Sequence, residues 1–199
     1  YRIDEWLYTK VENRFVKELC ADLTPGTAID LAGGEGRNSM WLAKQGWTVE
    51  NVDFSSVALK KFRRWVREES ATDPSLAKRC FTTKADARGF KSKLAPADLG
   101  VIAYLQIDQY ELAAAIGGLV GKLKPGATLV GVWHSLDNLA GGFGGPRNPN
   151  VLPSVERIRA ILSGLNVDIE VLENRDGQIQ TQEGLKPSIT LVLKARVRA

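Results

Sequence analysis

The feature that most constrains the fold is a regular alternation of strand-like and helix-like segments along the 199 residues. Short apolar runs of strand length are followed by longer amphipathic segments, and glycine or proline separates many of them. Such alternation requires right-handed βαβ crossovers and a mostly parallel sheet with helices packed against it. The predicted strands are residues 27–31, 47–53, 80–84, 99–105, 128–133, 167–173 and 189–197.

Capping and turn residues place the helices between these strands. A helix over residues 36–45 stops at Gly46, and a second is capped by Ser55 or Ser56 and runs to about residue 70. A third covers residues 109–123 and ends at a turn over residues 124–126, and a fourth is capped by Ser154, with Val155, Ile158, Ile161 and Leu162 on its inner face. The last two strands flank a turn at residues 176–177, so we expect them to pair antiparallel.

Composition excludes several classes of protein. The chain is 44% apolar and 25% charged, as in ordinary globular domains, and no apolar run approaches the roughly 18 residues of a membrane span. The first residues show no signal-peptide pattern. The two cysteines, Cys20 and Cys80, form neither a disulfide framework nor a zinc motif. We therefore expect a cytoplasmic protein with both thiols reduced, no bound metal and no membrane partner.

The net charge of +4 is concentrated in residues 60–67. Such a run is either a nucleic-acid footprint or the solvated face of a helix. The second interpretation is favoured, with the cations in water and the apolar positions inward, so nucleic acid is an unlikely partner. The inward positions are Val57, Leu59, Phe62 and Val66.

A glycine-rich turn follows the first predicted strand, in the run Asp30-Leu31-Ala32-Gly33-Gly34-Glu35-Gly36-Arg37-Asn38. Glycines between a strand and a helix let the backbone lie close to a ligand, but dinucleotide, phosphate and adenosyl sites all use such turns. Asp30 discriminates among them, because a carboxylate there repels a pyrophosphate and attracts an ammonium or sulfonium group. Ser39 also stands where a dinucleotide fingerprint has Gly or Ala.

Two further aspartates end the next two strands. Asp53 closes the second strand, where a carboxylate accepts hydrogen bonds from both hydroxyls of a ribose. Asp86 follows the third strand and can accept from an adenine amino group, although alone it is also an ordinary loop aspartate. The carboxyl ends of the strands in such a sheet are where ligands bind. Three acids at successive strand ends therefore predict an adenosyl ligand.

These segments resemble the class I S-adenosylmethionine-dependent methyltransferases, and the branch they are most similar to is the small tellurite-resistance-like and thiopurine-methyltransferase-like group. The resemblance is carried by residues 28–38, Trp41-Leu42-Ala43, Gly46-Trp47, residues 52–55 and residues 123–129. It implies one domain over residues 1–199 with a Rossmann-like, doubly wound sheet of seven strands, mostly parallel, whose last strand is antiparallel and inserted between the fifth and sixth.

The resemblance also implies the cofactor contacts. Asp30, Gly34, Gly36 and the backbone of Ala32 and Gly33 would surround the methionyl part of S-adenosyl-L-methionine. Asp53 would hold the ribose, Phe54 would lie beside the adenine, and Asp86 with Ala87 would bind the adenine edge. Ala103 and Tyr104 would close the methionyl side, and residues 13–16 resemble part of a lid helix within residues 1–24. Ala32 departs from the usual glycine, and because alanine prefers negative φ we expect slightly less room there.

The acceptor side is predicted at the long loop after the fifth strand, residues 134–153. His134, the only histidine, is a candidate general base or a hydrogen-bonded strand-end residue. The candidates for binding the acceptor are Tyr104, Gln106, Asp137, Phe143 and Arg147. Positioning alone supplies much of the catalysis in methyl transfer, so no catalytic triad is required.

Four functions remain open on the sequence. The first is methyl transfer to a small-molecule acceptor. The others are an NAD(P)-dependent oxidoreductase on a similar sheet, a non-catalytic adenosyl-binding module, and an RNA or protein methyltransferase.

Overall fold

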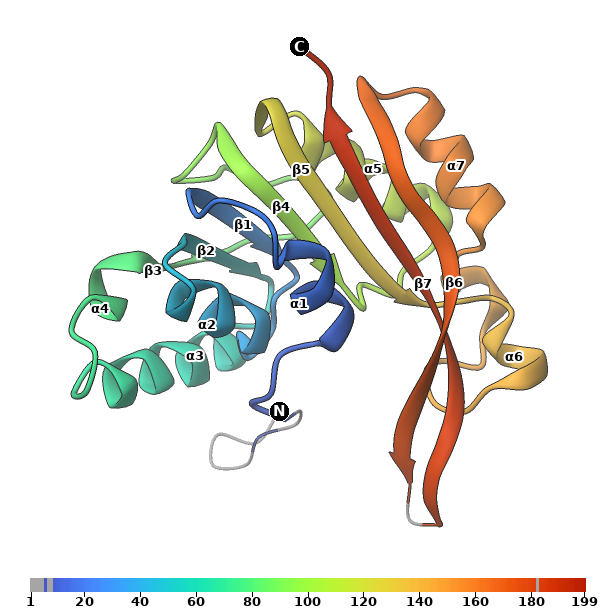
Figure 1. Cartoon of the computed structure of the whole chain (residues 1–199), viewed down its shortest axis with the longest axis horizontal. Helices are drawn as coiled ribbons and strands as arrows, with labels where there is room; N and C mark the ends of the chain where they lie inside the picture. The colour runs from blue at the N-terminus through green and yellow to red at the C-terminus, as the bar shows by residue number, and fades with distance from the viewer. Residues whose placement is uncertain (1–5, 7–8, 182) are drawn as a thin grey trace.

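The computed structural model describes Trp6, residues 9–181 and residues 183–199. Within these residues seven strands form one sheet, in the order β3-β2-β1-β4-β5-β7-β6 (Figure 1). The first five strands pair in parallel, and β7 pairs antiparallel with both β5 and β6. The predicted sheet and the position of its last strand are confirmed. The strands are β1 (Thr27–Leu31), β2 (Thr48–Asp53), β3 (Cys80–Lys84), β4 (Ala97–Ala103), β5 (Leu123–His134), β6 (Val167–Thr181) and β7 (Gly184–Val197).

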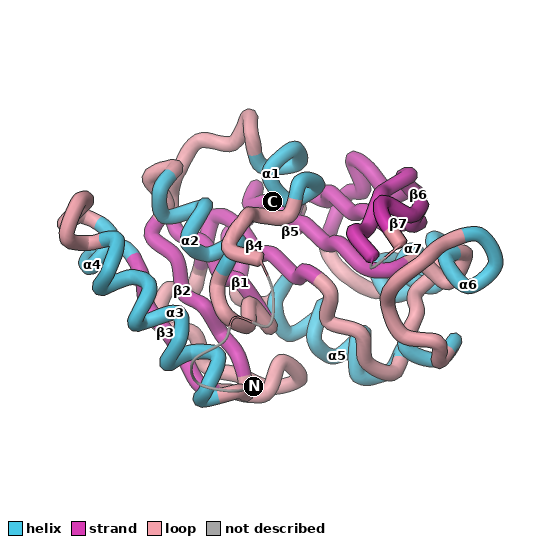
Figure 2. The backbone as a smooth tube through the Cα atoms, turned by 90° about the horizontal axis from the view of Figure 1, so that it is seen from below, coloured by secondary structure: helices cyan, strands magenta, loops and turns pink. Residues whose placement is uncertain are grey.

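Helices cover both faces of the sheet. Figure 2 shows α1 and α2 on one side of it and α5 on the other. The helices of the described residues are α1 (Arg14–Cys20), α2 (Arg37–Lys44), α3 (Ser56–Glu69), α4 (Leu76–Arg79), α5 (Gln109–Val120), α6 (Asn138–Gly141) and α7 (Val155–Ser163), with a 3₁₀ turn η1 (Pro149–Val151). Side-chain caps start four of the longer ones, because the oxygens of Asn13, Ser55, Asp108 and Ser154 each accept from a backbone N–H of the first turn.

Two apolar clusters fill the space between sheet and helices. One joins strand residues such as Ile29 and Leu31 to α5 and α7 through Ile116 and Ile158. The other lies on the opposite face, where residues of α1, α2 and α3 pack on alternate strand positions such as Ala28. Alternation along β1 thus directs Asp30 toward the same face as Ala28, beneath α2.

The predicted turn at residues 124–126 is wrong. Helix α5 ends earlier, at Val120, and β5 begins at Leu123. The pairing of β4 with β5 jumps from Ala97↔Leu123 to Leu99↔Thr128, so Pro125 and Gly126 lie in an irregular, exposed stretch of the strand. The Pro-Gly pair therefore bends a strand instead of separating it from the helix.

The predicted turn at residues 176–177 is also wrong. Asp176 pairs with Ile189 and Gly177 with Ser188, so both strands continue far beyond the predicted hairpin. The resulting arm of β6 and β7 extends past the rest of the sheet in Figure 1. Gly177 fits inside a strand because an added Cβ would lie 2.6 Å from the hydroxyl oxygen of Ser188 on the paired strand.

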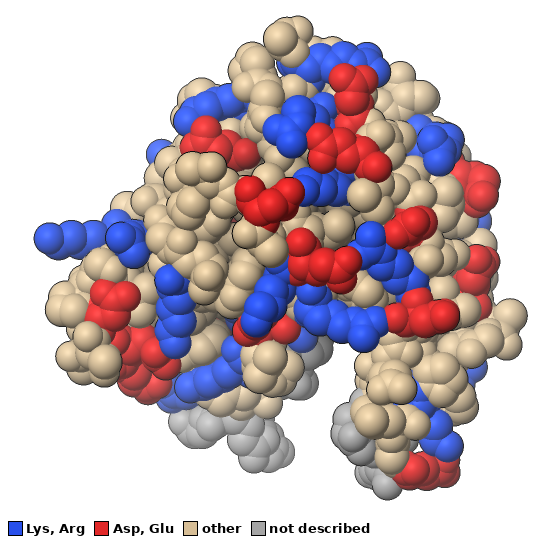
Figure 3. All heavy atoms as spheres, in the orientation of Figure 1, with Lys and Arg blue, Asp and Glu red and all other residues tan. Residues whose placement is uncertain are grey.

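The predicted solvation of the cationic helix holds only in part. Leu59, Phe62 and Val66 of α3 are buried, as predicted. Lys61, however, is only 2% exposed, so the expectation that all these cations lie in water is wrong at this position. Lys and Arg side chains are interspersed with Asp and Glu on the face drawn in Figure 3. That face therefore carries no continuous basic surface.

Both cysteines are free thiols; Cys20 is buried and Cys80 is half-buried. Burial raises the pKa of each thiol to about 12, so neither is a thiolate near neutral pH. None of the helices in the described part of the chain has the length and hydrophobicity needed to cross a membrane.

Candidate functional site

The carboxyl ends of β1, β2 and β4 lie side by side, because these strands are parallel neighbours. A cavity of about 300 Å³ opens at this edge of the sheet. Its lining includes five of the predicted cofactor residues: Ala32, Asp53, Phe54, Asp86 and Ala87. This volume is at the lower end of the range for small-molecule sites. The sheet therefore brings together the residues predicted for the ribose and adenine.

Asp30 lies under the glycine-rich turn and is completely buried. Its Oδ2 accepts a hydrogen bond of 2.6 Å from the Ser39 hydroxyl, while its Oδ1 has no partner among the described residues. Burial raises the pKa of Asp30 to about 6, and the nearby Asp53 carboxylate adds to this effect while the Ser39 bond opposes it. A buried carboxylate oxygen without a donor is costly, so this site favours a cationic or hydrogen-bonding ligand.

The turn itself is tightly constrained. A Cβ on Gly33 would lie 2.6 Å from Asn51 Oδ1 and 2.7 Å from Asp30 Oδ2, so only glycine fits above these acceptors. Gly36 starts α2 at a φ of 86°, and its N–H donates to the Gly33 carbonyl. The backbone of the turn at Gly33 therefore packs directly against the side chains of Asp30 and Asn51.

Ala32 has a φ of 57°, in the left-handed region that disfavours alanine. The turn thus keeps the backbone conformation of a glycine despite the added methyl group. Tyr104, at the end of β4, also has a positive φ, of 60°. Left-handed non-glycine residues at two adjacent strand ends are typical of functional sites, because the surrounding structure must enforce them.

Asp53 is fixed by backbone donors at both oxygens. The N–H of Gly34 donates to Oδ2 at 2.9 Å, and that of Ser55 donates to Oδ1 at 2.8 Å. Burial raises the pKa of Asp53, and these two bonds oppose the shift. Each carboxylate oxygen keeps further acceptor capacity toward the cavity. Phe54 is 73% exposed, so its ring is available to a planar ligand.

Several residues of this region were not predicted from the sequence. Asn51 donates to the Gly34 carbonyl at 3.1 Å, which ties β2 to the turn. Lys61 of α3 lies 2.6 Å from Glu35 Oε1, and both side chains are at most 4% exposed. Glu35 lies inside the turn, so this buried ion pair anchors the turn to α3. The polar character of Ser39 was a signal for the Asp30 bond. The position of Lys61, three residues after Ala58 and four before Trp65 on the buried face of α3, was a signal for its burial, but nothing local identified Glu35 as its partner.

Asp86 is fixed by Arg88, two residues further on. The Arg88 guanidinium donates from Nε to Oδ1 at 2.9 Å and from Nη2 to Oδ2 at 2.6 Å. These hydrogen bonds lower the pKa of Asp86 to about 2. The third nitrogen, Nη1, reaches Glu111 of α5 at 2.5 Å. All three side chains line the cavity.

His134 ends β5 and lies against Tyr104, with the two ring centroids 4.8 Å apart. Its Nδ1 is buried and has no partner among the described residues, and burial lowers the pKa of the imidazole, which is therefore neutral at pH 7. Asn13, the cap of α1, donates to the Tyr104 hydroxyl at 3.2 Å. The strand ends of β4 and β5 and the start of α1 thus meet at one cluster.

Several of the predicted acceptor residues already contact other side chains or backbone groups of the protein. Gln106 is held at both ends of its amide, because the oxygen accepts from His134 N and the nitrogen donates to the Val151 carbonyl. Asp137 is exposed and accepts from Asn174 of β6 at 2.7 Å. Phe143 is 44% exposed with Lys186 beside its ring, and Arg147 is exposed. No described contact joins Asp137, Phe143 or Arg147 to His134.

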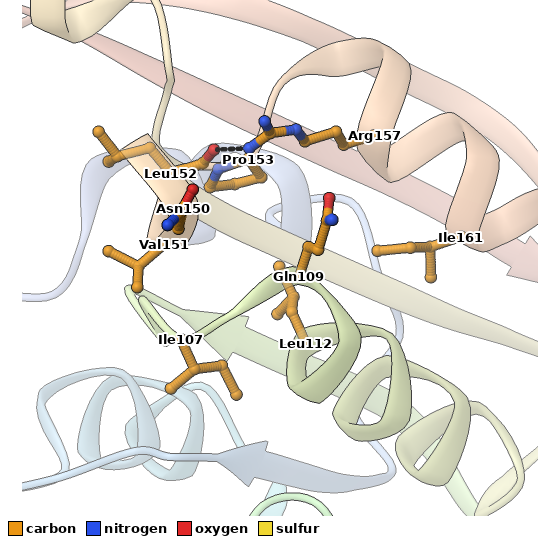
Figure 4. Close-up of a pocket in the computed structure, with 9 residues that line it drawn as sticks. All are labelled: Ile107, Gln109, Leu112, Asn150, Val151, Leu152, Pro153, Arg157 and Ile161. Atoms are coloured by element: carbon orange, nitrogen blue, oxygen red, sulfur yellow. Dashed lines mark hydrogen bonds between the residues drawn. The ribbon is translucent and has the colours of Figure 1, made fainter. Parts of the chain in front are cut away.

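The predicted acceptor loop, residues 134–153, is less irregular than expected, because it contains α6 and η1. A Cβ on Gly145 would lie 2.6 Å from His134 Cγ, so the loop backbone lies directly on the imidazole. The far end of the loop is fixed by Arg157 of α7, whose Nη1 donates to the carbonyl of Leu152 (Figure 4). The cavity there holds about 10 Å³, which is too small for a substrate.

Among the described residues, no group of three or more His, Cys, Asp or Glu side chains is arranged to hold a metal ion. An adenosyl sulfonium ligand, by contrast, fits the observed chemistry. The unpartnered Oδ1 of Asp30 would suit a cationic group, and the neighbouring cavity offers the Asp53 carboxylate and the exposed Phe54 ring.

The fold is that of the class I S-adenosylmethionine-dependent methyltransferases. The glycopeptide N-methyltransferase MtfA matches with a TM-score of 0.69 at 16% identity, over 92% of this chain and 94% of that one. Magnesium protoporphyrin IX methyltransferase ChlM from Synechocystis PCC 6803, solved with bound S-adenosylmethionine, matches with a TM-score of 0.65 at 20% identity, over 92% and 76%.

Within this fold, the sequence match is to one group. A family model of the tellurite resistance protein TehB matches residues 3–80, which supports the resemblance over the segment that contains β1, the glycine-rich turn and β2. The crystal structure of TehB from Haemophilus influenzae has a TM-score of 0.73 at 15% identity, over 92% of this chain. This chain spans 61% of the length of that TehB chain. No curated protein sequence matches significantly.

Proposed function

We propose that this protein is an S-adenosylmethionine-dependent methyltransferase that acts on a small-molecule acceptor. The observation that carries the proposal is Asp30, a fully buried carboxylate with an unpartnered oxygen directly beneath a glycine turn. A dinucleotide would place its pyrophosphate at such a turn, next to this carboxylate. An adenosyl sulfonium ligand would place cationic groups there, which the carboxylate attracts.

The bound cofactor would supply an activated methyl group on its sulfonium, and the protein's task would be positioning. Asp53 would accept the ribose hydroxyls, since both its oxygens are already oriented by backbone donors. Phe54 would cover the adenine, and Asp86 with Ala87 would bind its edge. Gly33, Gly34, Gly36, Ala32, Ala103 and Tyr104 would surround the methionyl part. Enforcing an in-line approach and excluding water would account for much of the rate.

We place the acceptor near His134 and Tyr104, where β4, β5 and α1 meet. A neutral imidazole with a free Nδ1 can take a proton from an incoming nucleophile. MtfA and ChlM are methyltransferases of a glycopeptide and of magnesium protoporphyrin, respectively, which favours a small molecule here too. Residues 134–153 would form the acceptor loop of a single domain over residues 1–199, and residues 9–24 would belong to the lid. Residues 1–5 and 7–8 of the predicted lid region lie outside the described residues. A cytoplasmic location stays a prediction of the sequence.

Isothermal titration calorimetry tests the proposal directly. S-adenosylmethionine and S-adenosylhomocysteine should bind at micromolar concentrations, NAD should not bind, and Asp53→Ala should weaken both adenosyl ligands. Loss of two charge-assisted hydrogen bonds predicts a decrease in affinity of about tenfold or more. No binding below millimolar concentration would refute the proposal. Transfer of a labelled methyl group to members of a metabolite panel separates an enzyme from a non-catalytic binding module.

A further inference from the structure

Three charged side chains form one wall of the 300 Å³ cavity: Asp86, Arg88 and Glu111. Asp86 follows β3, whereas Glu111 lies in the first turn of α5, after β4. Arg88 joins these two parts of the cavity wall, because its guanidinium contacts both carboxylates. The sequence predicted a role for Asp86 alone, and nothing in the family resemblance assigned one to Arg88 or Glu111.

The hydrogen bonds of Asp86 leave it little freedom. A carboxylate has roughly four acceptor positions. Oδ1 accepts from the backbone N–H of Arg88 at 2.9 Å and from its Nε at 2.9 Å. Oδ2 accepts from Nη2 at 2.6 Å. Three positions are therefore occupied, and the one that remains belongs to Oδ2.

We propose that Arg88 is a positioning residue that orients the Asp86 carboxylate so that Oδ2 accepts a hydrogen bond from the exocyclic amino group of adenine. This inference rests on the proposed function. Without Arg88, the carboxylate can rotate about its own side-chain bonds, and the acceptor has no fixed direction toward the ligand.

The chemistry of arginine suits this role. Its planar fork binds a carboxylate through two parallel hydrogen bonds, which fixes orientation as well as charge, whereas a lysine would supply only a point charge. The third guanidinium nitrogen, Nη1, donates to the Glu111 carboxylate, which restrains the orientation of the guanidinium. The low pKa of Asp86, about 2, keeps the carboxylate ionised and accepting at any working pH. All three side chains are 42–52% exposed, so the network contributes little to folding and its variants should fold.

The experiment compares two ligands that differ only at the amino group. Calorimetry measures the affinity of S-adenosylhomocysteine and of its analogue with purine in place of adenine. Wild-type protein should prefer the adenine ligand by about tenfold or more. Arg88→Met should lose most of this preference through weaker binding of S-adenosylhomocysteine, with the affinity for the purine analogue unchanged. Arg63→Met, an arginine of α3 outside the cavity lining, should keep the wild-type preference.

Asp86→Asn tests whether Arg88 acts on the ligand through Asp86. If Arg88 acts through Asp86, adding Arg88→Met to Asp86→Asn should change the preference little further, because the effects are coupled. Additive effects would overturn the inference, and so would an equal loss of affinity for both ligands in Arg88→Met. Wild-type protein that binds both ligands equally would overturn the inference while leaving the proposed function intact. Wild-type protein that binds neither would refute the proposed function itself.

Discussion

Replacing Asp30 by Asn should make the protein more stable and a weaker binder. The ordinary pKa of this carboxyl is 3.8, and in the folded protein burial raises it to about 6. A folded-state pKa above the unfolded one means that the folded state holds the proton more tightly. Ionisation therefore favours unfolding, and stability decreases as the pH rises from about 4 to above 6.

The size of the effect follows from the two pKa values. Well above pH 6 the ionised Asp30 costs the folded state on the order of 3 kcal/mol, and at pH 5 it costs about half as much. Asp30→Asn removes this cost, and its amide oxygen can still accept from Ser39. For a domain of this size the gain at pH 8 corresponds to a rise in melting temperature of about 6–12 °C.

Urea unfolding of the wild-type protein and Asp30→Asn at pH 5 and pH 8 measures the gain in the free energy of unfolding at each pH. The gain from Asp30→Asn should be about twice as large at pH 8. Asp73→Asn is a matched control, because hydrogen bonds from the Ser75 hydroxyl and N–H lower the pKa of Asp73, so this change should not stabilise the protein. If Asp30→Asn destabilises the protein equally at both pH values, burial does not govern this carboxyl and the reasoning fails. The same variant should bind S-adenosylhomocysteine more weakly, which would make Asp30 a case of stability given up for function.

Three further changes test the site. Lys61→Met removes one partner of a buried ion pair and should lower the free energy of unfolding by about 3–5 kcal/mol in urea titrations, whereas a loss below about 1 kcal/mol would contradict the anchoring role. Ala32→Gly relieves a left-handed alanine and should stabilise the protein by up to about 1 kcal/mol in the same assay; a loss of stability would show that the methyl group packs favourably. His134→Gln should lower kcat for methyl transfer by about 100-fold without changing the affinity for S-adenosylhomocysteine, and an unchanged kcat would exclude a general-base role.

Much of the fold could be predicted because its signals are local. The strand ends at Leu31 and Asp53 lie where apolar runs meet glycine or serine, and Ser55 caps α3 as predicted. The failures concern residues whose role depends on distant partners. Pro125-Gly126 has the composition of a turn, yet β4 pairs with Leu123 before it and with Thr128 after it, so β5 continues through it. The turn expected at Asp176-Gly177 failed for the same reason, since β7 pairs across it.

The candidate site shows the same division. Asp53 and Asp86 could be found because they follow strands, and position in a parallel sheet is enough to bring them together. The partner of Lys61 could not be predicted, because Glu35 is 26 residues away in the sequence. Arg88 gave no signal either, since one of its two carboxylate partners, Glu111, comes from a different βα unit. Sequence patterns therefore identify residues by their position at strand ends, but they do not reveal which distant side chains pair with one another.

The insertion of β7 between β5 and β6 has a consequence for assembly. β5 is buried from Ala127 to Trp133, and its outer edge is covered only by a strand near the end of the described chain. Until β6 and β7 form their hairpin and dock, that edge presents unpaired backbone groups beside apolar side chains, which is a template for intermolecular pairing. Truncation within β7 should therefore yield aggregates instead of a smaller soluble domain. We expect docking of the β6–β7 hairpin to complete the sheet and to cover this edge of β5.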